Sequence, residues 1–567
     1  MELRLLAAFI LMGVVLFLTP YFYKTVAPPV KKNAPLVTTS QPVSGAPAAA
    51  PPATPAEVAV TSTPDNTAVP RVAARDEQLY SIDTDVFRIS FSNRGGTVKS
   101  WLLKKYRAHG GNPLELVNTA AKIEPPFALY FSGPKPSPDV NQALYEAHLD
   151  PDRLGISFDF SDGNTTAHKT FRFSKSSYLS KVSTEVTAAG RPVPHLIEWR
   201  GGFGDLAVAN PSAAGQTLRF DLTDGKLVKS AAKAAKNGPV TATGSYSFAG
   251  IEDAYFVAVF LPERATAVEM ATFSDSTPTV LDQKETAFAG TAVGAAASAA
   301  AGDGSVNRFE LYVGPKDIDI LRAVNPKLEQ VVDFGWLSFL AKPLFLIVNW
   351  VVDHAVHNYG WSIILVTVAL NFILFPLKLT SMKSMKKMQA LQPQIASIND
   401  KYKNIGLRDP RKSEQNQEVM ELYKKHGVNP MGGCVPMLLQ IPFFIAFYKV
   451  FSVSVEMRGA HWLWVTDLSQ PETLPIHILP IVMIASQFLM QKMTPPATGG
   501  DPNQQRMMMF MPLIFGFMFY NFSSGLVLYY LTSNLVGIAQ QLFFNRTSIA
   551  AVAAQSVQPP KKRIGRK

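Results

Sequence analysis

The chain contains a single cysteine, Cys434, among 567 residues, and its charged residues make up only 17% of the total. One cysteine excludes an intrachain disulfide and a cysteine-rich metal cluster. The scarcity of charge accompanies a 47% share of hydrophobic residues, which gather at the extreme N-terminus and from about residue 335 onward. This distribution predicts a membrane protein with a soluble region between its apolar parts.

The soluble region also lacks a recognisable catalytic set. Its histidines are scattered, and each is expected to be structural or solvated rather than a ligand: His109, His148, His168 and His195. An envelope enzyme acting on sugars stays open as an alternative, but it would need a clustered acid–base pair. The sequence therefore predicts no catalytic residue, no metal site and no cofactor.

The first apolar run, LLAAFILMGVVLFLTPYFY, covers residues 5–23. It suits either a cleaved signal peptide or an uncleaved anchor. No A-x-A site follows closely, and the aromatic residues 21–23 are typical of a membrane interface, so an anchor over 1–24 is favoured. Residues 25–75 are rich in Pro, Ala, Thr and Ser, and this composition predicts a disordered tether.

Residues 76–325 consist of short alternating runs separated by turn residues, which predicts one large β-sandwich. VFRISFSNRGGTVKSWLL (86–103) and HKTFRFSKSSYLSKVSTEV (168–186) are expected to form hairpins. YSFAGIEDAYFVAVFLP (246–262) and FELYVGP (309–315) are further strand candidates. Gly95 and Gly96 are expected to serve the first hairpin's turn.

The segment 326–360 contains the apolar run FGWLSFLAKPLFLIVNWVV (334–352). A membrane span here would place the next basic loop outside, against the positive-inside tendency. Lys342-Pro343 and Asn349 interrupt the run, and Trp336 and Trp350 suit an interface. We therefore expect an amphipathic helix that lies on the outer membrane surface.

Five spans are predicted to form the core 361–545, at about 361–378, 432–452, 474–491, 507–522 and 526–544. The first anchor makes six. Loop 379–430 and tail 546–567 are rich in Lys and Arg, whereas loop 453–473 is mostly acidic. The charges therefore predict cytoplasmic N- and C-termini and a periplasmic β domain. The basic segments also suit anionic lipid or RNA.

Polar side chains interrupt four of these five spans, beginning with Thr367 and Asn371 in the first. One reading is interhelical hydrogen bonding, worth about 0.6–2 kcal/mol a pair. The other is a shared hydrated groove, which the number of helices involved favours. Carboxylates are nearly absent from the spans, which argues against a proton relay. Internal repeats are absent too, which argues against a transporter or channel, the main alternative.

Two more features accompany the spans. The span 507–522 would reach roughly 24 Å, short of a hydrocarbon core near 30 Å, and would thin the bilayer. In the cytoplasmic loop, Met382, Met385 and Met388 begin an apolar stripe at helical spacing that ends near a break at 406–410. Two helices of a hairpin would pack these stripes together, or expose a soft methionine surface for apolar segments.

NPMGGCVPMLLQIPFF, DPNQQRMMMFMPLIF and SGLVLYYLTSNLVGIAQQ resemble signature stretches of the YidC family of membrane protein insertases, relatives of the mitochondrial oxidase-assembly and chloroplast thylakoid insertases. The resemblance covers nearly the whole chain and is weaker over 76–325. It implies a non-enzymatic insertase and chaperone of the inner membrane, which accepts hydrophobic segments of new membrane proteins.

The resemblance also implies partners. These are transmembrane segments of nascent proteins, the Sec translocase (SecYEG, with SecD and SecF), membrane lipids and the ribosome, reached through the basic hairpin and tail. No specific DNA binding is implied. Lys386 and Lys387 join Met382, Met385 and Met388 as the expected cytoplasmic reception site for clients.

The expected client groove takes residues from both arguments, the polar spans and the resemblance: Thr367, Asn371, Gln440, Ile441, Pro442, Phe444, Gln487, Tyr529, Tyr530, Ser533 and Asn534. Asn371 falls where many family members carry a buried arginine. An amide can hydrogen-bond but supplies no charge. Lys378 and Lys449 are expected to lie too near a membrane surface to replace that charge.

Overall fold

The computed structural model describes residues 70–108, 111–119, 123–204, 215–263, 267–278, 285–296, 306–402, 411–428, 435–493 and 502–556. The predicted anchor, nearly all of the predicted tether, the hairpin break at 406–410 and Cys434 lie outside these residues. The C-terminal end of the predicted basic tail, 557–567, does so too.

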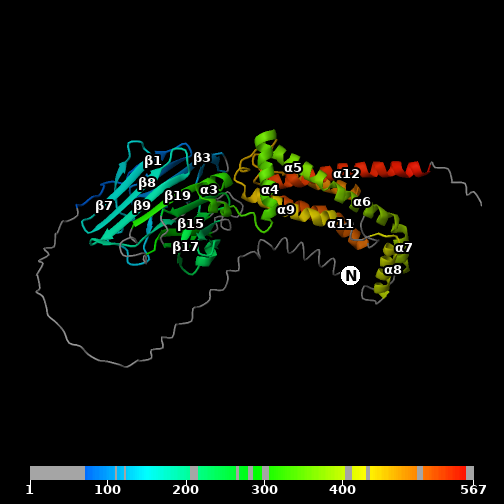
Figure 1. The fold of residues 1–567 in the computed structure, drawn as a ribbon, viewed down its shortest axis with the longest axis horizontal. Helices are drawn as coiled ribbons and strands as arrows, with labels where there is room; N and C mark the ends of the chain where they lie inside the picture. The colour runs from blue at the N-terminus through cyan, green and yellow to red at the C-terminus, as the bar shows by residue number, and fades with distance from the viewer. Residues whose placement is uncertain are drawn as a thin grey trace, which may run out of the picture. The chain divides into compact units, whose positions relative to one another are not determined.

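The β domain contains three antiparallel sheets within the described residues (Figure 1). The first has the order β1 (Leu79–Asp83), β2 (Phe87–Ser92), β3 (Thr97–Arg107) and β4 (Pro113–Glu115). The largest has the order β13 (Lys226–Ala231), β12 (Gln216–Asp221), β15 (Tyr246–Glu252), β16 (Phe256–Pro262), β19 (Val306–Pro315), β9 (Leu179–Ala188), β8 (Thr165–Phe173), β7 (Gly155–Ser161) and β6 (Glu146–Leu149), with β10 (Arg191–Pro192) on β9. The third has the order β14 (Val240–Gly244), β17 (Val268–Pro278), β18 (Glu285–Ala295), β11 (Leu196–Trp199) and β5 (Leu129–Tyr130).

The two predicted hairpins are confirmed, because β2 pairs with β3 and β8 with β9, both antiparallel. The strand candidate 246–262 also forms an antiparallel pair, β15 with β16. Gly95 and Gly96 form the first turn with φ of +67° and +56°, a conformation that favours glycine. The isolated bridge between Val72 and Ser161 shows that the last residues of the predicted tether already lie against the domain.

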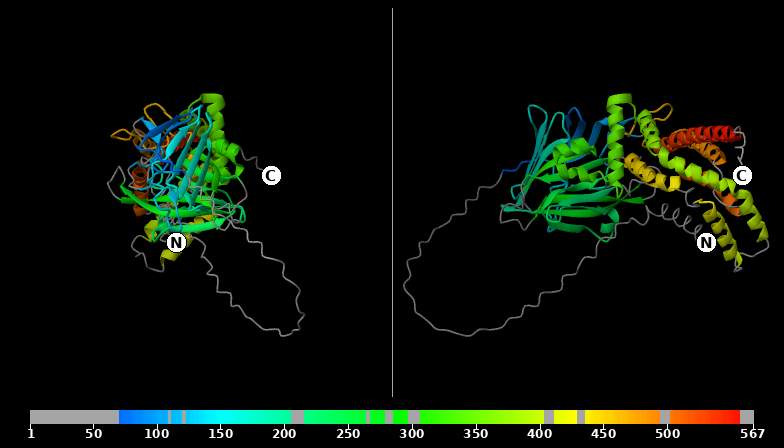
Figure 2. Two further views of the ribbon diagram at one scale, coloured as in Figure 1. Left: turned by 90° about the vertical axis from the view of Figure 1, so that its left-hand side faces the viewer. Right: turned by 45° about the vertical axis from the view of Figure 1, so that its right-hand side comes forward.

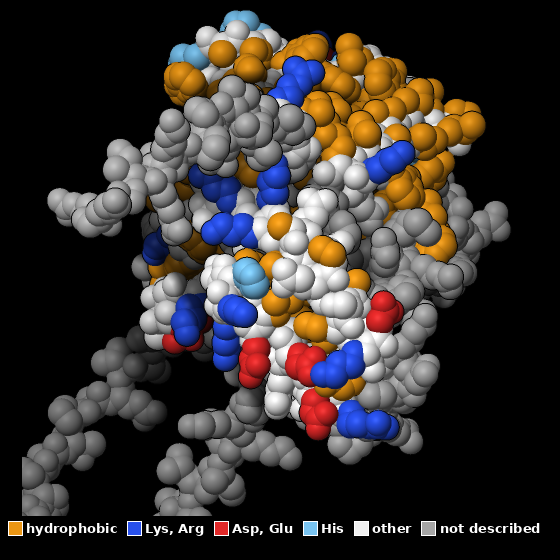
Figure 3. Space-filling model, turned by 90° about the vertical axis from the view of Figure 1, so that its right-hand side faces the viewer, with side chains coloured by type: hydrophobic (Ala, Val, Ile, Leu, Met, Phe, Trp, Pro, Cys, Tyr) orange, Lys and Arg blue, Asp and Glu red, His pale blue; other side chains and the backbone are white. Residues whose placement is uncertain are grey.

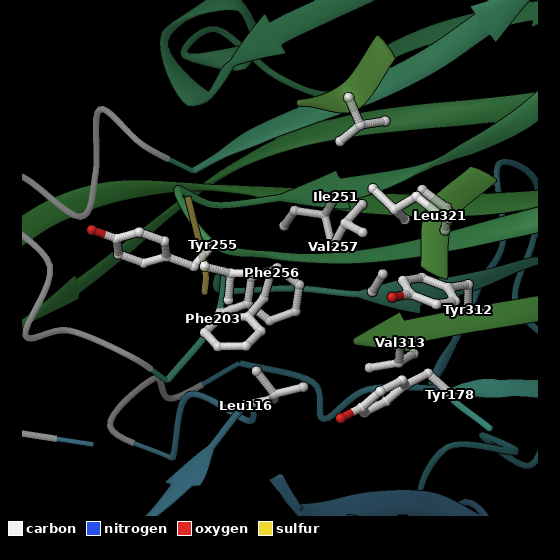
Figure 4. Packing of buried hydrophobic residues seen from close by; sticks show 14 of the residues in the cluster. Leu116, Tyr178, Phe203, Ile251, Tyr255, Phe256, Val257, Tyr312, Val313 and Leu321 are labelled. Carbon is white, nitrogen blue, oxygen red and sulfur yellow. The ribbon is translucent and has the colours of Figure 1, made fainter. Parts of the chain in front are cut away.

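Aromatic side chains join the three sheets into one core. The rings of Phe91 (β2) and Phe171 (β8) lie 5.0 Å apart between centroids, and those of Trp101 (β3) and Trp199 (β11) lie 5.9 Å apart. Figure 4 shows another part of this core, where side chains of β15, β16 and β19 meet Leu321 of α3 (Ile318–Val324). The alternating apolar pattern therefore builds a β-sandwich, as the sequence predicts.

Lys169 of β8 lies inside this core with no exposed surface. Its Nζ donates hydrogen bonds to the backbone oxygens of Gly95 and Phe127, at 2.6 and 2.7 Å. Burial lowers the pKa of Lys169 to about 7, because the charged form loses its hydration. A buried lysine in this position couples the stability of the domain to pH.

We expect the β domain to become more stable as pH rises from about 7 toward 10. In this window the unfolded chain binds a proton at Lys169 that the folded domain releases, so the free energy of unfolding increases by at most about 5 kcal/mol. Urea titrations with limited proteolysis would measure it on the full-length protein. Lys169→Met should flatten the rise, and an identical rise in the variant would contradict the assignment.

The segment after the β domain forms η2 (Pro326–Val331), helix α4 (Ser338–Val351) and the π turn η3 (Val352–Val356). One face of α4 packs on the neighbouring helices through Ala341, Leu344, Phe345 and Val348. Figures 1 and 2 show α4 running across the direction of α5, α9 and α12 rather than alongside them. This crossing is what a helix on a membrane surface requires when its neighbours span the membrane.

Length and composition, taken alone, select α4 rather than its neighbours as the described helix best suited to cross a membrane. Ser338–Val356 is long and apolar enough to cross a membrane, and the bent pair α5–α6 is a second candidate if it counts as one span. Shorter apolar helices are Leu438–Val453, Ile478–Met493 and Phe510–Phe519. The placement of α4 on the outer surface stays a prediction.

The helical region contains α5 (Tyr359–Ile373), α6 (Phe375–Ala390), α9 (Val435–Val453), α10 (Ile478–Met493), α11 (Pro502–Phe519) and α12 (Ser524–Ser556). The expected first span, 361–378, is not one straight helix, because the chain bends by 58° between α5 and α6. Pro376 starts the second helix, and its missing N–H interrupts the hydrogen-bond ladder. α12 continues beyond the expected boundary at 545.

The helices of the predicted cytoplasmic hairpin also differ in detail from the prediction. The first apolar stripe is divided between two helices. α6 ends at Ala390, and α7 (Gln392–Lys401) follows with Pro393 in its first turn. α7 and α8 (Arg411–Lys425) pack through a small core of Met388, Leu391, Ile395, Tyr423 and Val428. For Met388 the structure therefore supports packing between the helices rather than an exposed methionine surface. Met382 and Met385 stay half-buried.

Candidate functional site

Asn371 lies on the buried face of α5 and is 5% exposed. Its Nδ2 donates to the backbone oxygen of Thr367 at 2.8 Å and lies 3.4 Å from Ser533 Oγ of α12. Its backbone oxygen accepts from Gln540 Nε2 at 3.2 Å. The amide that interrupts the first span is thus held by its own helix and by α12, which explains how it is tolerated.

Lys378 supplies a charge at this point. Its Nζ donates to Asn371 Oδ1 at 2.5 Å, and the lysine is half-buried. Lys378 therefore reaches Asn371, and its depth in the membrane stays a prediction. Seven residues, or about two helical turns, separate it from Asn371, and its long stem folds back along the bend at Leu374. This spacing is the sequence signal that could have found the contact.

Ser533 of α12 connects this pair to a fourth helix. Its Oγ accepts from Gln440 Nε2 of α9 at 3.2 Å. Asn371, Lys378, Ser533, Gln440 and Gln540 thus form one polar network across α5, α6, α9 and α12. Loss of any one partner would leave another polar group of the network without its hydrogen bond, so the network is expected to act as a unit.

The remaining polar candidates fall outside this network. Asn534 Nδ2 donates to Ser486 Oγ at 3.1 Å, which joins α12 to α10 instead. Thr367 Oγ1 donates to Ile363 within its own helix at 2.6 Å. Gln487 has a buried Oε1 without a hydrogen-bond partner among the described residues. The predicted polar residues therefore separate into two interhelical groups.

The aromatic candidates pack rather than join polar groups. Tyr529 stacks on Phe447 of α9 with ring centroids 4.2 Å apart. Phe444 and Tyr530 both pack on Phe519 of α11, with ring centroids 5.6 and 5.0 Å apart. Phe447 and Phe519 were not predicted as site residues, because aromatic residues in apolar spans carry no sequence signal that separates them from ordinary core. Ile441 and Pro442 are half-buried on α9.

The β domain contains buried titratable side chains that bear on the alternative, a catalytic site. Arg200 pairs with Asp275 at 2.5 Å and with Glu198 at 3.4 Å. Burial lowers the pKa of His195 to about 4, and its Nε2 lies 2.8 Å from Thr184 Oγ1. These charged and polar groups hold one another inside the fold. No group of metal-binding side chains is found among the described residues.

These features define the class: an α-helical membrane protein with a large β-sandwich domain. Comparison with known families agrees. The model of the 60 kDa inner membrane protein family matches residues 351–551, and that of the YidC periplasmic domain matches residues 79–347. The chain belongs to the YidC family of membrane protein insertases.

Named relatives are similar over nearly their full length. The membrane protein insertase YidC of Syntrophus aciditrophicus is 33% identical, with 96% of this chain and 100% of that protein covered. That of Geobacter metallireducens is 33% identical, with 98% and 100% covered. A crystal structure described as an active YidC insertase with its first transmembrane domain resolved matches 84% of this chain and 94% of its own, with 20% identity and a TM-score of 0.35.

Proposed function

We propose that this protein inserts newly made membrane proteins into the inner membrane and assists their folding, alone or beside the Sec translocase. The observation that carries the proposal is the network of Lys378, Asn371, Ser533 and Gln440 between the membrane helices. It offers a polar tail a path into the apolar region, while hydrophobic partitioning of the client's transmembrane segment supplies the driving force. No nucleotide or covalent step is needed.

We propose further that the network lines a hydrated groove. The carbonyl oxygens of Gln487 and Gln540 are buried without a hydrogen-bond partner among the described residues. Buried acceptors in native proteins are usually satisfied by ordered water when no side chain meets them. Gln540 belongs to the network, so its unpaired carbonyl oxygen supports the proposal that water reaches this site.

Lys378 gives the groove its charge. The resemblance implies a buried arginine at this position in many family members, whereas here Asn371 holds the ammonium group of a residue from the next helix. A cation at low dielectric attracts an acidic tail far more strongly than one in water. The charge-attraction part of the mechanism is thus proposed to be retained with a different residue.

Bilayer thinning is proposed to lower the barrier further. Helix α10 has 16 residues, which at about 1.5 Å each span roughly 24 Å of a hydrocarbon core near 30 Å. Short spans thin the surrounding bilayer and shorten the path of a polar tail.

The proposed topology keeps both termini in the cytoplasm and the β domain in the periplasm. Arg458, in the loop between α9 and α10, donates to the backbone oxygen of Arg107 at 3.3 Å and lies over the ring of Tyr255. These contacts support the proposal that this loop and the β domain lie on the same side of the membrane. The opposite end carries α7 and α8, with Lys and Arg side chains beside a hydrophobic surface (Figure 3).

The basic end of the molecule is proposed to receive clients and ribosomes. Lys386 and Lys387 are exposed on α6, and Lys386 also lies over the ring of Phe544. Met382 and Met385 are half-buried beside them and keep part of their soft surface available. Basic side chains at this end would also contact anionic lipid headgroups.

Reconstitution tests the function. The purified protein in liposomes should render a small single-span client inaccessible to external protease, because its tail has crossed the bilayer. Empty liposomes are the control. No protection above this control would contradict insertase function, and solute uptake without client insertion would favour a transporter instead.

A further inference from the structure

A cleft of about 480 Å³ lies between η2 and the first turn of α4. Its lining is polar at one end, with Glu329, Asp333 and Lys342, and includes Gly335 and Ser338. Glu329 accepts from Lys342 and, at 2.9 Å, from Arg322 Nε, so its carboxylate is fully paired. Neither client insertion nor packing of the β domain uses this cleft.

Two charged side chains, one beside the cleft and one in its lining, have no opposite charge among the described residues. Lys449 of α9 lies beside the cleft: it is half-buried, and its Nζ lies 3.9 Å from the position that a Cβ on the lining residue Gly335 would take. It forms no ion pair within the described ranges. Asp333 is exposed and accepts only the backbone N–H of Gly335, at 2.8 Å. A half-buried cation without a partner is unfavourable unless a ligand or solvent meets it.

The apolar surface that continues from the cleft belongs to α4. Phe339, Leu346, Ile347 and Trp350 recur at the spacing of one helix face, and between 47 and 73% of each side chain is exposed. Trp336, at the cleft's edge, is 68% exposed. The opposite face of α4 is packed on the helices, so this face has no protein cover among the described residues and suits acyl chains.

We propose that this cleft binds the headgroup of a phospholipid with a primary amine, of the phosphatidylethanolamine type, from the outer leaflet. Lys449 and Lys342 meet the phosphodiester, and Asp333 accepts hydrogen bonds from the ammonium group. The acyl chains lie along the exposed face of α4. A phosphate alone would leave Asp333 unmatched, whereas a zwitterionic headgroup complements both unpaired charges.

Native mass spectrometry of the full-length protein, released from vesicles of equal phosphatidylethanolamine, phosphatidylcholine and phosphatidylglycerol, tests the assignment. Wild-type protein should retain phosphatidylethanolamine above the other two lipids. Lys449→Gln should lower its retention about tenfold, because a charge-assisted hydrogen bond is lost. Lys449→Arg should keep most of it. Lys424→Gln, on the exposed cytoplasmic helix α8, is the matched control and should change nothing.

Asp333→Asn separates the two halves of the headgroup. It should abolish the preference for phosphatidylethanolamine over its trimethylated analogue phosphatidylcholine, while total phospholipid retention stays near wild type. Because Asp333 is exposed, this variant also serves if Lys449→Gln fails to fold. Equal retention of the three lipids by wild type, or an unchanged preference for phosphatidylethanolamine in Asp333→Asn, would overturn the proposal.

Discussion

Lys378→Met is expected to lower the insertion of clients with acidic tails by at least about tenfold, because one charge-assisted contact of roughly 1.5–3 kcal/mol is removed. Methionine keeps the length and apolar stem of the side chain but cannot donate to Asn371 Oδ1. Clients whose tail acids are replaced by amides should insert at nearly the wild-type rate. Protease protection in proteoliposomes, measured as an initial rate for both clients, gives the comparison.

Two further variants make this test specific. Lys378→Arg should keep most of the activity, since guanidinium also donates to an amide oxygen. Lys383→Met removes an exposed lysine from the same helix, α6, and should have little effect on either client. If Lys378→Met and Lys383→Met lowered insertion equally, the loss would reflect the general charge of the cytoplasmic surface and the proposed groove cation would be wrong.

The β domain could be predicted well because its hairpins are local. The alternating runs around Gly95–Gly96 and at 246–262 contain both paired strands and their turn, so periodicity alone gives the pairing. The order of strands in the large sheet could not be predicted in this way. β9 pairs with β19, whose residues lie more than a hundred positions away, and no local pattern encodes such a partner.

The helical region shows the same division between local and distant information. The apolar runs predicted that α9 to α12 exist, but they did not predict the bend at Leu374. This bend depends on Pro376, and a proline in a membrane helix is often tolerated without a sharp bend because neighbouring groups satisfy the freed carbonyls. The contact between Lys378 and Asn371 was not predicted, for a related reason. Its depth was inferred from its position along the chain, whereas its long side chain points back to Asn371. The polar residues of the site could be predicted because polar side chains are rare in hydrocarbon. Their contacts could not be predicted, because these depend on how the helices pack.

Asn371→Leu is expected to have the second large effect, and a broader one. Leucine cannot accept from Lys378 or donate toward Ser533, so the network loses its central group. Insertion should fall for clients with acidic tails and with polar uncharged tails, and stay near wild type for apolar tails. The protein itself should lose about 1–3 kcal/mol of stability from unpaired polar groups. Phe372→Leu, at the next position but 62% exposed, is the matched control.

A double-mutant cycle separates hydration from charge. If Asn371 acts on acidic tails mainly by holding Lys378, then Asn371→Leu combined with Lys378→Met should insert acidic clients no worse than Asn371→Leu alone.

A charge swap tests where the cation must lie. Arginine at position 371 places two cations together while Lys378 is present, so Asn371→Arg alone should be impaired. Asn371→Arg with Lys378→Asn moves the cation to α5 and should recover insertion of acidic clients. A double variant as poor as Lys378→Met would show that the position of the charge, and not its presence, sets the activity. Strictly additive losses in the first cycle would show that the two residues serve different steps.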